Sequence, residues 1–471
     1  MKKNDILTAI VSSYGSEGEG IVKIDGYTIF LPFAIPGEKI RFKILKVNKN
    51  IAFARVEEVL TPAEERVRAK CPVFQKCGGC QLMHISYNKQ LALKSEMIAN
   101  TLRKIGFLSV APPKTVASTP EFYYRNKLQL PIRQTNEGVK IGFFAINSHR
   151  VVPINNCIIH GEWCEKVIAA LKTYIEEKRI SAYNEELHTG LLRHIIVKKV
   201  GLKFIVILVI NGTKINGLSY FKELLEVALG VDYSLFLNIN TREDNVILTD
   251  EFIPVCGNNF ANDSVLQINY SIGPASFMQV NDNVKLKLYQ KVCDLVGNAS
   301  TVIDAYCGAG LLTSLLARQA KKVIGVEIVQ EAVDCANALV LNNGINNASF
   351  VCAPCEEVLP DMIKQNPNAV IVLDPPRKGI DKKVALAVMK ARPKKIVYIS
   401  CSLQTLARDI GIIGGTLKYE DNNLKKCVDA VIDCKEGEKM PNGYKISYLC
   451  GFDMFAQCKG LETLCVLTLD E

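Results

Sequence analysis

Cys401 stands at a position where α/β enzymes often carry a reacting group. It follows an apolar run, KIVYIS (395–400), and precedes a polar segment with a helical pattern, SLQTLARD (402–409). This pattern predicts a strand followed by a helix, with the thiol at the strand tip. A thiolate is a strong nucleophile once its pKa is lowered. Most single cysteines are instead small buried core residues, so Cys401 has to be weighed with its neighbours.

Two further predicted strand ends carry groups suited to a nucleoside ligand. DAYCGAG (304–310) has the pattern of a strand, a glycine turn and an apolar helix, and Gly308 and Gly310 let the backbone approach a ligand closely. Thr313 replaces the third glycine of the dinucleotide fingerprint, and Glu327 ends the next strand, where a carboxylate can accept both ribose hydroxyls. This combination favours S-adenosylmethionine over a dinucleotide; the alternative is a glycine turn in an ordinary α/β core.

DPPR (374–377) marks another strand end. Two prolines cannot continue a sheet, so they direct Asp374 into a cleft or, alternatively, leave it to cap the next helix. Carbon 5 of a pyrimidine is a poor nucleophile, but thiolate addition at carbon 6 makes an enolate that can take a methyl group. A cysteine such as Cys401 beside a methyl donor suits this chemistry.

These residues need a sheet that brings several strand ends to one edge. From about residue 266, helical patterns separate five short apolar runs: TVIDAY, KVIGVE, SFVCA, AVIVLD and KIVYIS. Repeated β-α units predict an α/β fold with a doubly wound parallel sheet, which binds ligands outside its C-terminal strand ends. We therefore expect a Rossmann-like domain at 266–471.

The first part of the chain follows other patterns. Residues 1–61 alternate short β-branched runs with Gly, Pro and Asn turns, which predicts a five-stranded β-barrel of a kind that often binds oligonucleotides. Residues 62–265 combine a helical segment at 87–107 with several strands, and we expect a central mixed α+β domain there. A chain of 471 residues is too long for one core, which agrees with several domains.

The net charge of +9 is concentrated in one region. Residues 61–140 contain thirteen Lys or Arg against five Asp or Glu residues, which suggests a nucleic acid partner, although a solvated basic face explains the charge equally well. No apolar run is long enough to span a membrane, and the N-terminus lacks the apolar core of a signal peptide. We expect a cytoplasmic protein with no membrane partner, whose seventeen cysteines are reduced.

CPVFQKCGGC (71–80) places three thiols within ten residues. Cys71, Cys77 and Cys80, with two glycines for a tight loop, predict a metal site. Candidates for a fourth ligand are Cys157 first, then His84, His160 and Cys164. Zinc accepts three cysteines plus Cys or His, and an iron–sulfur cluster prefers four cysteines, so the residues alone leave both open.

The order and spacing of the motifs resemble those of the uracil-C5 RNA methyltransferases, which make 5-methyluridine in ribosomal and transfer RNA. In chain order the motifs are SFMQVN (276–281), DAYCGAG (304–310), GVE (325–327), LDPPRKG (373–379) and SCSLQTLARD (400–409). Residues 1–60 resemble a TRAM domain, a small RNA-binding barrel. The resemblance therefore covers nearly the whole chain.

The resemblance implies roles for individual residues. Cys401 would be the nucleophile, and Glu462, in DMFAQCKGLETLCVL (453–467), would be the base that removes the carbon 5 proton. The pattern alone would make Glu462 a surface carboxylate on a strand. S-adenosylmethionine would be contacted by Gln279, Tyr306, Glu327 and Asp374. A [4Fe–4S] cluster with a structural or RNA-positioning role would be held by Cys71, Cys77, Cys80 and Cys157.

The chain departs from the family pattern beside both reacting groups. Ser402-Leu403 replaces Asn-Pro, and Gly460-Leu461 replaces His-Val. The departures motivate one alternative, a non-catalytic RNA-binding protein, which the retained nucleophile and base argue against. Methylation of cytosine or of an amino group is another alternative, which DPPR followed by a strand-tip cysteine disfavours. The barrel and cysteine set resemble the bacterial 23S ribosomal RNA enzymes more than the transfer RNA enzymes; oligomeric state is not indicated.

Overall fold

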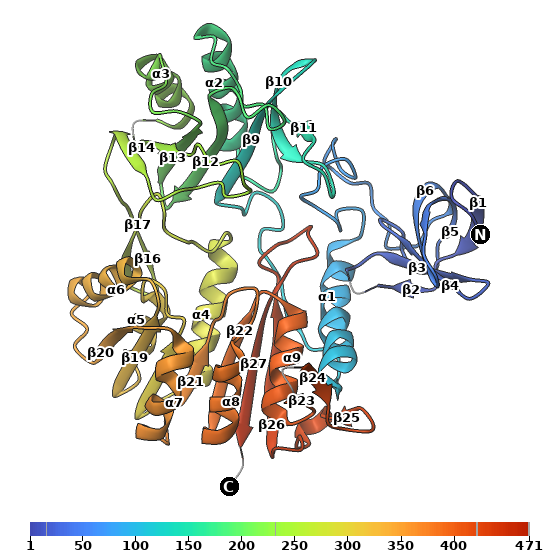
Figure 1. The fold of residues 1–471 in the computed structure, drawn as a ribbon, viewed down its shortest axis with the longest axis vertical. Helices are drawn as coiled ribbons and strands as arrows, with labels where there is room; N and C mark the ends of the chain where they lie inside the picture. Colours follow the sequence, from blue (N-terminus) through green and yellow to red (C-terminus); the bar gives the residue numbers. More distant parts are fainter. Residues whose placement is uncertain (16, 231, 421–422, 470–471) are drawn as a thin grey trace.

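The computed structural model describes residues 1–15, 17–230, 232–420 and 423–469. They form three large sheets, which we call the N-terminal, central and C-terminal sheets. In Figure 1 the central sheet lies above the C-terminal sheet, and the N-terminal sheet lies to the right of both. No described helix is long and apolar enough to cross a membrane.

The N-terminal sheet has six strands in the order β1-β5-β6-β4-β3-β2. The strands are β1 (Ile6–Ile10), β2 (Ser13–Tyr14), β3 (Gly20–Ile24), β4 (Tyr27–Leu31), β5 (Lys39–Val47) and β6 (Ile51–Thr61). Alternate residues of β5, including Ile40, Phe42 and Ile44, are buried in a core of this sheet's own. The prediction of five strands missed β2, which at two residues is too short to show a period.

The central sheet has seven strands in the order β11-β10-β9-β12-β13-β14-β15. They are β9 (Lys127–Thr135), β10 (Gly138–Phe144), β11 (Val151–Pro153), β12 (Leu192–Val200), β13 (Lys203–Ile210), β14 (Tyr233–Ile239) and β15 (Phe252–Cys256). The strand pairs are antiparallel except β13–β14, which is parallel because the helix α3 (Leu218–Leu229) crosses over between them. The helix α2 (Trp163–Glu177) shares a core with α3 and this sheet.

The C-terminal sheet has eight strands in the order β20-β19-β18-β21-β22-β27-β26-β8. They are β8 (Thr115–Val116), β18 (Thr301–Ala305), β19 (Lys322–Glu327), β20 (Ala348–Cys352), β21 (Val370–Leu373), β22 (Lys395–Ser400), β26 (Tyr444–Phe452) and β27 (Glu462–Leu469). Strands β18 to β22 are the five predicted apolar runs and are parallel, with the chain order reversing at β18. This confirms the doubly wound α/β prediction. The last strand, β27, lies antiparallel between β22 and β26.

Helices cover both faces of the C-terminal sheet. They are α1 (Tyr87–Thr101), α4 (Asp282–Val296), α5 (Leu311–Leu316), α6 (Gln330–Asn342), α7 (Cys355–Gln365), α8 (Lys382–Ala391) and α9 (Leu403–Gly414). The helices α4, α5 and α6 share one apolar core with the sheet, and α1, α7, α8 and α9 share the core on the opposite face. Strand residues alternate between the two cores: Val302 belongs to the first core and Ile303 to the second.

The short elements connect these sheets. A hairpin of β16 (Ala261–Val265) and β17 (Ile268–Ile272) leads from the central sheet to α4. The helix α1 and the strand β8 belong to the expected central span, 62–265, yet they pack on the C-terminal sheet, with β8 beside β26. The other short elements are η1 (Leu102–Gly106), β7 (Leu108–Ser109), β23 (Leu417–Glu420), β24 (Asn423–Lys426), β25 (Ile432–Asp433) and η2 (Lys435–Gly437).

Gly310→Ala should destabilise the turn between β18 and α5. Gly310 has a φ of 79°, and a Cβ there would lie 2.7 Å from the Ala336 Cβ and 2.9 Å from the Phe350 ring. A left-handed non-glycine residue costs about 1–2 kcal/mol, and overpacking adds about 1–3 kcal/mol. Gly344→Ala is the matched control, because Gly344 has a φ of 64° and open space around it. Equal losses of unfolding free energy in urea would contradict the close packing.

Candidate functional site

One cavity of about 1500 Å³ is lined by all ten residues that the family resemblance assigned to catalysis, donor binding or the metal site. The lining comes from β9 and β10 of the central sheet and from the carboxyl ends of β18, β19, β21 and β22. The ten predicted residues that line it are Cys71, Cys77, Cys80, Cys157, Gln279, Tyr306, Glu327, Asp374, Cys401 and Glu462. Residues from positions 71 to 462 of the sequence thus share one space.

Glu327 is held rigidly at the end of β19. Its carboxylate accepts hydrogen bonds from three backbone N–H groups, those of Gly308 at 3.0 Å, Ile328 at 2.9 Å and Val329 at 3.0 Å. The glycine turn after β18 and the turn after β19 are therefore tied together through this one side chain. A carboxylate so oriented can receive the hydroxyls of a ribose on its free lone pairs.

Asp304, inside the DAYCGAG motif, is a fully buried acid that the sequence did not single out. Thr313 Oγ1 donates to Asp304 Oδ2 at 2.6 Å, while Asp304 Oδ1 is buried without a partner. Burial raises the pKa of this carboxyl to about 7. An unpaired buried oxygen on a cavity wall is an acceptor for a donor group on a ligand. Thr313, noted in the sequence only for not being glycine, therefore orients the Asp304 carboxyl.

Asp374 does not cap the following helix. The N-cap of α8 is Asp381, whose side chain accepts from the Lys383 N–H at 2.8 Å. Asp374 instead lines the cavity, as the first alternative from the DPPR motif predicted. Burial, and then the neighbouring Asp304 carboxylate, raise the pKa of Asp374 to about 7.

Cys401 and Glu462 are neighbours because β27 is antiparallel to β22. The register pairs Ser400 with Thr463, so the residue that follows β22 lies beside the first residue of β27. Burial raises the pKa of the Cys401 thiol, and the Glu462 carboxylate raises it further. Burial and then Asp374 raise the pKa of Glu462 to about 8. A thiol and a protonatable carboxyl thus face one cavity.

Arg377 opposes these shifts and was missed in the sequence. Its charge lowers the pKa of both Cys401 and Glu462, and its side chain lines the same cavity. A cation beside a thiol favours the thiolate, the form that acts as a nucleophile. The position was within the quoted DPPR motif, so a cationic residue that follows the strand-end acid and its two prolines was the available signal.

The departures from the family pattern are accommodated locally. Leu403 is the first residue of α9, the position at which proline is common because its N–H has no partner there in any case. Leucine is compatible with that position, and Leu403 is buried. Leu461 is also buried directly before Glu462. Both substitutions therefore leave the helix start and the strand start in place.

The loop before Gln279 is fixed from the central sheet. Lys198, buried on β12, donates from Nζ to the carbonyls of Gly273 at 3.1 Å, Pro274 at 2.7 Å and Ser276 at 2.6 Å. Asn126 Nδ2 donates to the Gln279 carbonyl at 3.1 Å. No sequence pattern pointed to Lys198, because a lysine within a strand carries no local signal of its partners.

The four predicted cysteine ligands lie around one end of the cavity. Cys77 lies close enough to Cys71, Cys80 and Cys157 for charge on one thiolate to raise the pKa of its neighbour. Burial raises the pKa of Cys157 to about 12 and also raises that of Cys77. Within the described part of the chain, no three His, Cys, Asp or Glu side chains converge closely enough to hold a single metal ion.

The competing candidates for a fourth ligand fit less well. His160 Nε2 is 3.0 Å from the Lys127 carbonyl, and burial lowers the pKa of His160 to about 3. His84 and Cys164 are buried and do not line the cavity. Cys157 alone of the four candidates combines a cavity position with thiol chemistry.

The doubly wound sheet thus brings the strand-end carboxylates and the strand-tip cysteine to one cavity. The model of the tRNA (Uracil-5-)-methyltransferase family matches residues 86–425, and that of the TRAM domain matches residues 2–56. The chain belongs to this methyltransferase family.

Relatives that match along the whole chain are also RNA methyltransferases by name. An uncharacterized RNA methyltransferase of Clostridium tetani is 36% identical over 99% of this chain and 97% of its own length. One of Listeria innocua is 36% identical over 100% of this chain and 99% of its own. The crystal structure of Pyrococcus abyssi tRNA (uracil-54, C5)-methyltransferase in complex with S-adenosyl-L-homocysteine has the same fold, with a TM-score of 0.73, 23% identity and coverage of 98% of this chain and 100% of that one.

Glu462→Gln should stabilise the protein increasingly as the pH rises from 5 to 8.5. The pKa of about 8 lies above the ordinary 4.5, so between these values the folded state holds a proton that the unfolded state releases. The stability that Glu462 contributes is therefore lost as the pH rises through this window, by about 1.4 kcal/mol per pH unit, and Gln removes the loss. The measurement is urea unfolding of both proteins at both pH values. Glu64→Gln, an exposed site, is the control, and a pH-independent difference for Glu462→Gln would refute the raised pKa.

Proposed function

We propose that the protein methylates carbon 5 of uridine in RNA, with 23S ribosomal RNA as the preferred substrate and transfer RNA as the second candidate. The observation that carries this proposal is the placement of Cys401 beside Glu462 at the strand edge where Glu327 and Asp374 also lie. A methyltransferase of simple amino groups needs neither a thiol nor a second base at this place.

Cys401 would begin the reaction by adding its thiolate to carbon 6 of the uracil ring. The enolate that results takes the methyl group of S-adenosylmethionine at carbon 5 and leaves S-adenosylhomocysteine. Glu462 then removes the carbon 5 proton, and the bond from carbon 6 to sulfur breaks to return the Cys401 thiolate. Arg377 supports the first step, since its charge lowers the pKa of Cys401.

The methyl donor fits the carboxylate-rich wall. Asp304, Glu327 and Asp374 lie on the cavity, and Asp304 Oδ1 has no partner in the protein. S-adenosylmethionine carries a positive sulfonium, an amino group and ribose hydroxyls, all suited to carboxylates. Gln279 and Tyr306 would complete this pocket, with the Gln279 loop held by Lys198.

A [4Fe–4S] cluster would be held by Cys71, Cys77, Cys80 and Cys157. In such a cluster each thiolate binds a different iron, so four sulfurs around a common space fit it better than they fit one zinc ion. The thiols of Cys77, Cys80 and Cys157, whose pKa values are raised, become thiolates when a bound metal compensates their charge. The proposed role is structural, because methyl transfer needs no electron transfer.

RNA would enter between the N-terminal and central sheets. Glu17, in the loop between β2 and β3, pairs with Lys459 and accepts from Gln404 Nε2 at 3.4 Å. This loop therefore contacts one residue shortly after Cys401 in the chain and one shortly before Glu462. On the central sheet, Arg125, Lys127 and Phe143 line the cavity. A stacked uracil cannot be methylated at its edge, so the base has to be flipped out or come from a loop. We further propose a cytoplasmic location, where reduced cysteines persist.

The function is tested by methylation of in vitro transcribed 23S ribosomal RNA and transfer RNA with labelled S-adenosylmethionine. We expect 5-methyluridine in ribosomal RNA by mass spectrometry. Cys401→Ala should bind RNA but lose at least about 10³-fold in turnover, while Cys427→Ala, at an exposed cysteine, should not. Product in transfer RNA alone would make transfer RNA the substrate in place of ribosomal RNA. Turnover by Cys401→Ala would refute the covalent mechanism, and binding without any product would favour the non-catalytic alternative.

The cluster is tested by anaerobic purification. We expect bound iron and broad visible absorption, both lost in serine variants of Cys71, Cys77, Cys80 and Cys157. Cys164→Ala is the control, because Cys164 is a nearby buried thiol that does not line the cavity. Stoichiometric zinc without visible absorption would contradict the cluster.

A further inference from the structure

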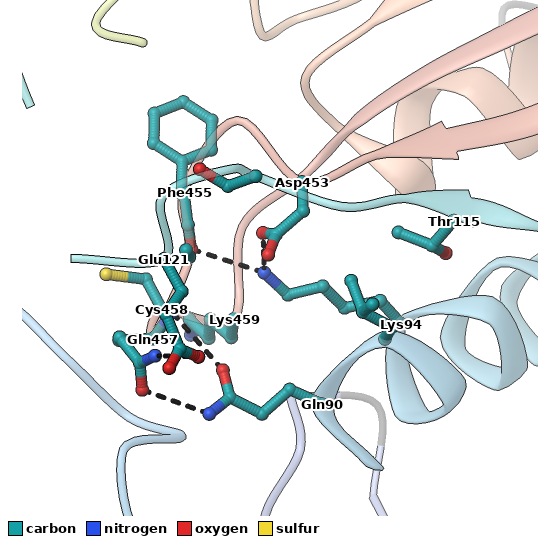
Figure 2. A network of polar contacts seen from close by, with 12 residues as sticks. Gln90, Lys94, Thr115, Glu121, Asp453, Phe455, Gln457, Cys458 and Lys459 are labelled. Atoms are coloured by element: carbon teal, nitrogen blue, oxygen red, sulfur yellow. Dashed lines mark hydrogen bonds and ion pairs between the residues drawn. The ribbon is translucent and has the colours of Figure 1, made fainter. Parts of the chain in front are cut away.

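The loop of residues 453–461 joins β26 to β27 and ends at Glu462. Its first residue, Asp453, pairs with Lys94 of α1 in an ion pair whose two side chains have no exposed surface. Tyr87 Oη donates to Asp453 Oδ2 at 2.7 Å, and Lys94 Nζ also donates to the Phe455 carbonyl at 3.2 Å. Figure 2 shows Lys94 reaching both partners from its helix. The start of the 453–461 loop is thus fixed to α1.

The middle of the loop is fixed to α1 and to the residues directly after the cysteine segment 71–80. Gln90 Nε2 donates to Gln457 Oε1 at 3.0 Å, and the Gln457 N–H donates to Gln90 Oε1 at 3.2 Å (Figure 2). The Leu82 N–H donates to the Gln457 carbonyl at 2.9 Å. The Lys459 N–H donates to Gln81 Oε1 at 3.3 Å. The segment after the cysteines therefore runs alongside the loop.

Cys458 makes the direct link to a predicted cluster ligand. Its buried thiol lies 3.0 Å from the Gly79 carbonyl and 3.9 Å from Cys80 Sγ. Either sulfur can supply the hydrogen when both are thiols. Once Cys80 is a thiolate bound to iron it can only accept, so the Cys458 S–H becomes the donor. Glu462 follows Cys458 by four residues in the chain.

We propose that Cys458 is a positioning residue for the base Glu462, coupling the metal-bound cysteine segment to the 453–461 loop through its contacts with Cys80 and Gly79. The inference rests on the proposed function and gives the cluster a task in it. Metal binding orders the cysteine segment, the segment fixes Cys458 and its neighbours, and these fix the point at which β27 begins. The effect falls on proton removal, the step that Glu462 performs, and leaves donor binding and thiolate addition unchanged.

The test uses the full chain, purified anaerobically with its metal, as wild type, Cys458→Ala, Cys458→Val and Cys458→Ser. Alanine and valine remove the donor, valine while filling the space, and serine restores a donor. Cys427→Ala is the matched control at an exposed cysteine outside the cavity. Readouts are turnover, visible absorption, and the fraction of RNA in a covalent adduct that survives denaturation.

On uridine RNA, we expect Cys458→Ala and Cys458→Val to turn over at least about tenfold more slowly, because a base displaced by a fraction of an ångström acts poorly. The covalent adduct should accumulate, since it forms before the base acts. On 5-fluorouridine RNA, fluorine replaces the proton to be removed, so every protein should reach the same adduct level. Visible absorption should match wild type, and Cys458→Ser should recover most of the turnover.

Wild-type turnover and adduct levels in both donor-free variants would overturn the inference. So would a lower adduct level on 5-fluorouridine RNA, which places the defect before the base step, or a loss of visible absorption, which makes Cys458 part of cluster assembly. Wild type that forms neither 5-methyluridine nor the 5-fluorouridine adduct would overturn the proposed function itself, and this inference with it.

Discussion

The antiparallel pairing of β27 with β22 is the constraint on which the site depends. In an all-parallel sheet the start of the last strand would lie at the edge opposite to the other strand ends. Because β27 runs the other way, its first residue, Glu462, meets Cys401 at the carboxyl end of β22. A slip of one residue would also turn every β27 side chain to the opposite face, and both faces here are packed. Core packing thus fixes the register, and the register fixes the spacing of the two reacting groups.

The electrostatics of the cavity follow from burying several acids on one wall. Asp304, Asp374 and Glu462 all have raised pKa values, chiefly because burial disfavours their charged forms. Arg377 compensates part of this cost at the end where Cys401 and Glu462 meet. A cationic donor such as S-adenosylmethionine would compensate more of it, so the acids and the proposed donor are complementary. The site without its ligand is therefore expected to hold protons that ligand binding releases.

The other two sheets act as supports for this edge. The central sheet supplies Lys198, which holds the loop before Gln279, and the N-terminal sheet supplies Glu17, which pairs with Lys459. The cysteine segment adds a third support through Cys458 and Gln457. Glu17 and Lys459 are more than 400 positions apart in the sequence, so distant parts of the chain meet beside this edge.

The five parallel strands could be predicted from the amino-acid sequence, because each is an apolar run bounded by turns. The strand-end positions of Glu327, Asp374 and Cys401 could be predicted too, because chain direction places them. The metal site that the close cysteine spacing predicts stays a prediction. Glu462 came only from a family resemblance, since an alternating strand pattern does not say beside which strand it will lie. Three features are visible only in the folded chain: the insertion of β27, the unpaired oxygen of Asp304, and the contacts of Lys198, Arg377 and Cys458. Each depends on partners distant in the chain. Strand pairing, burial and charge interactions act through space, so they leave no pattern in the local sequence.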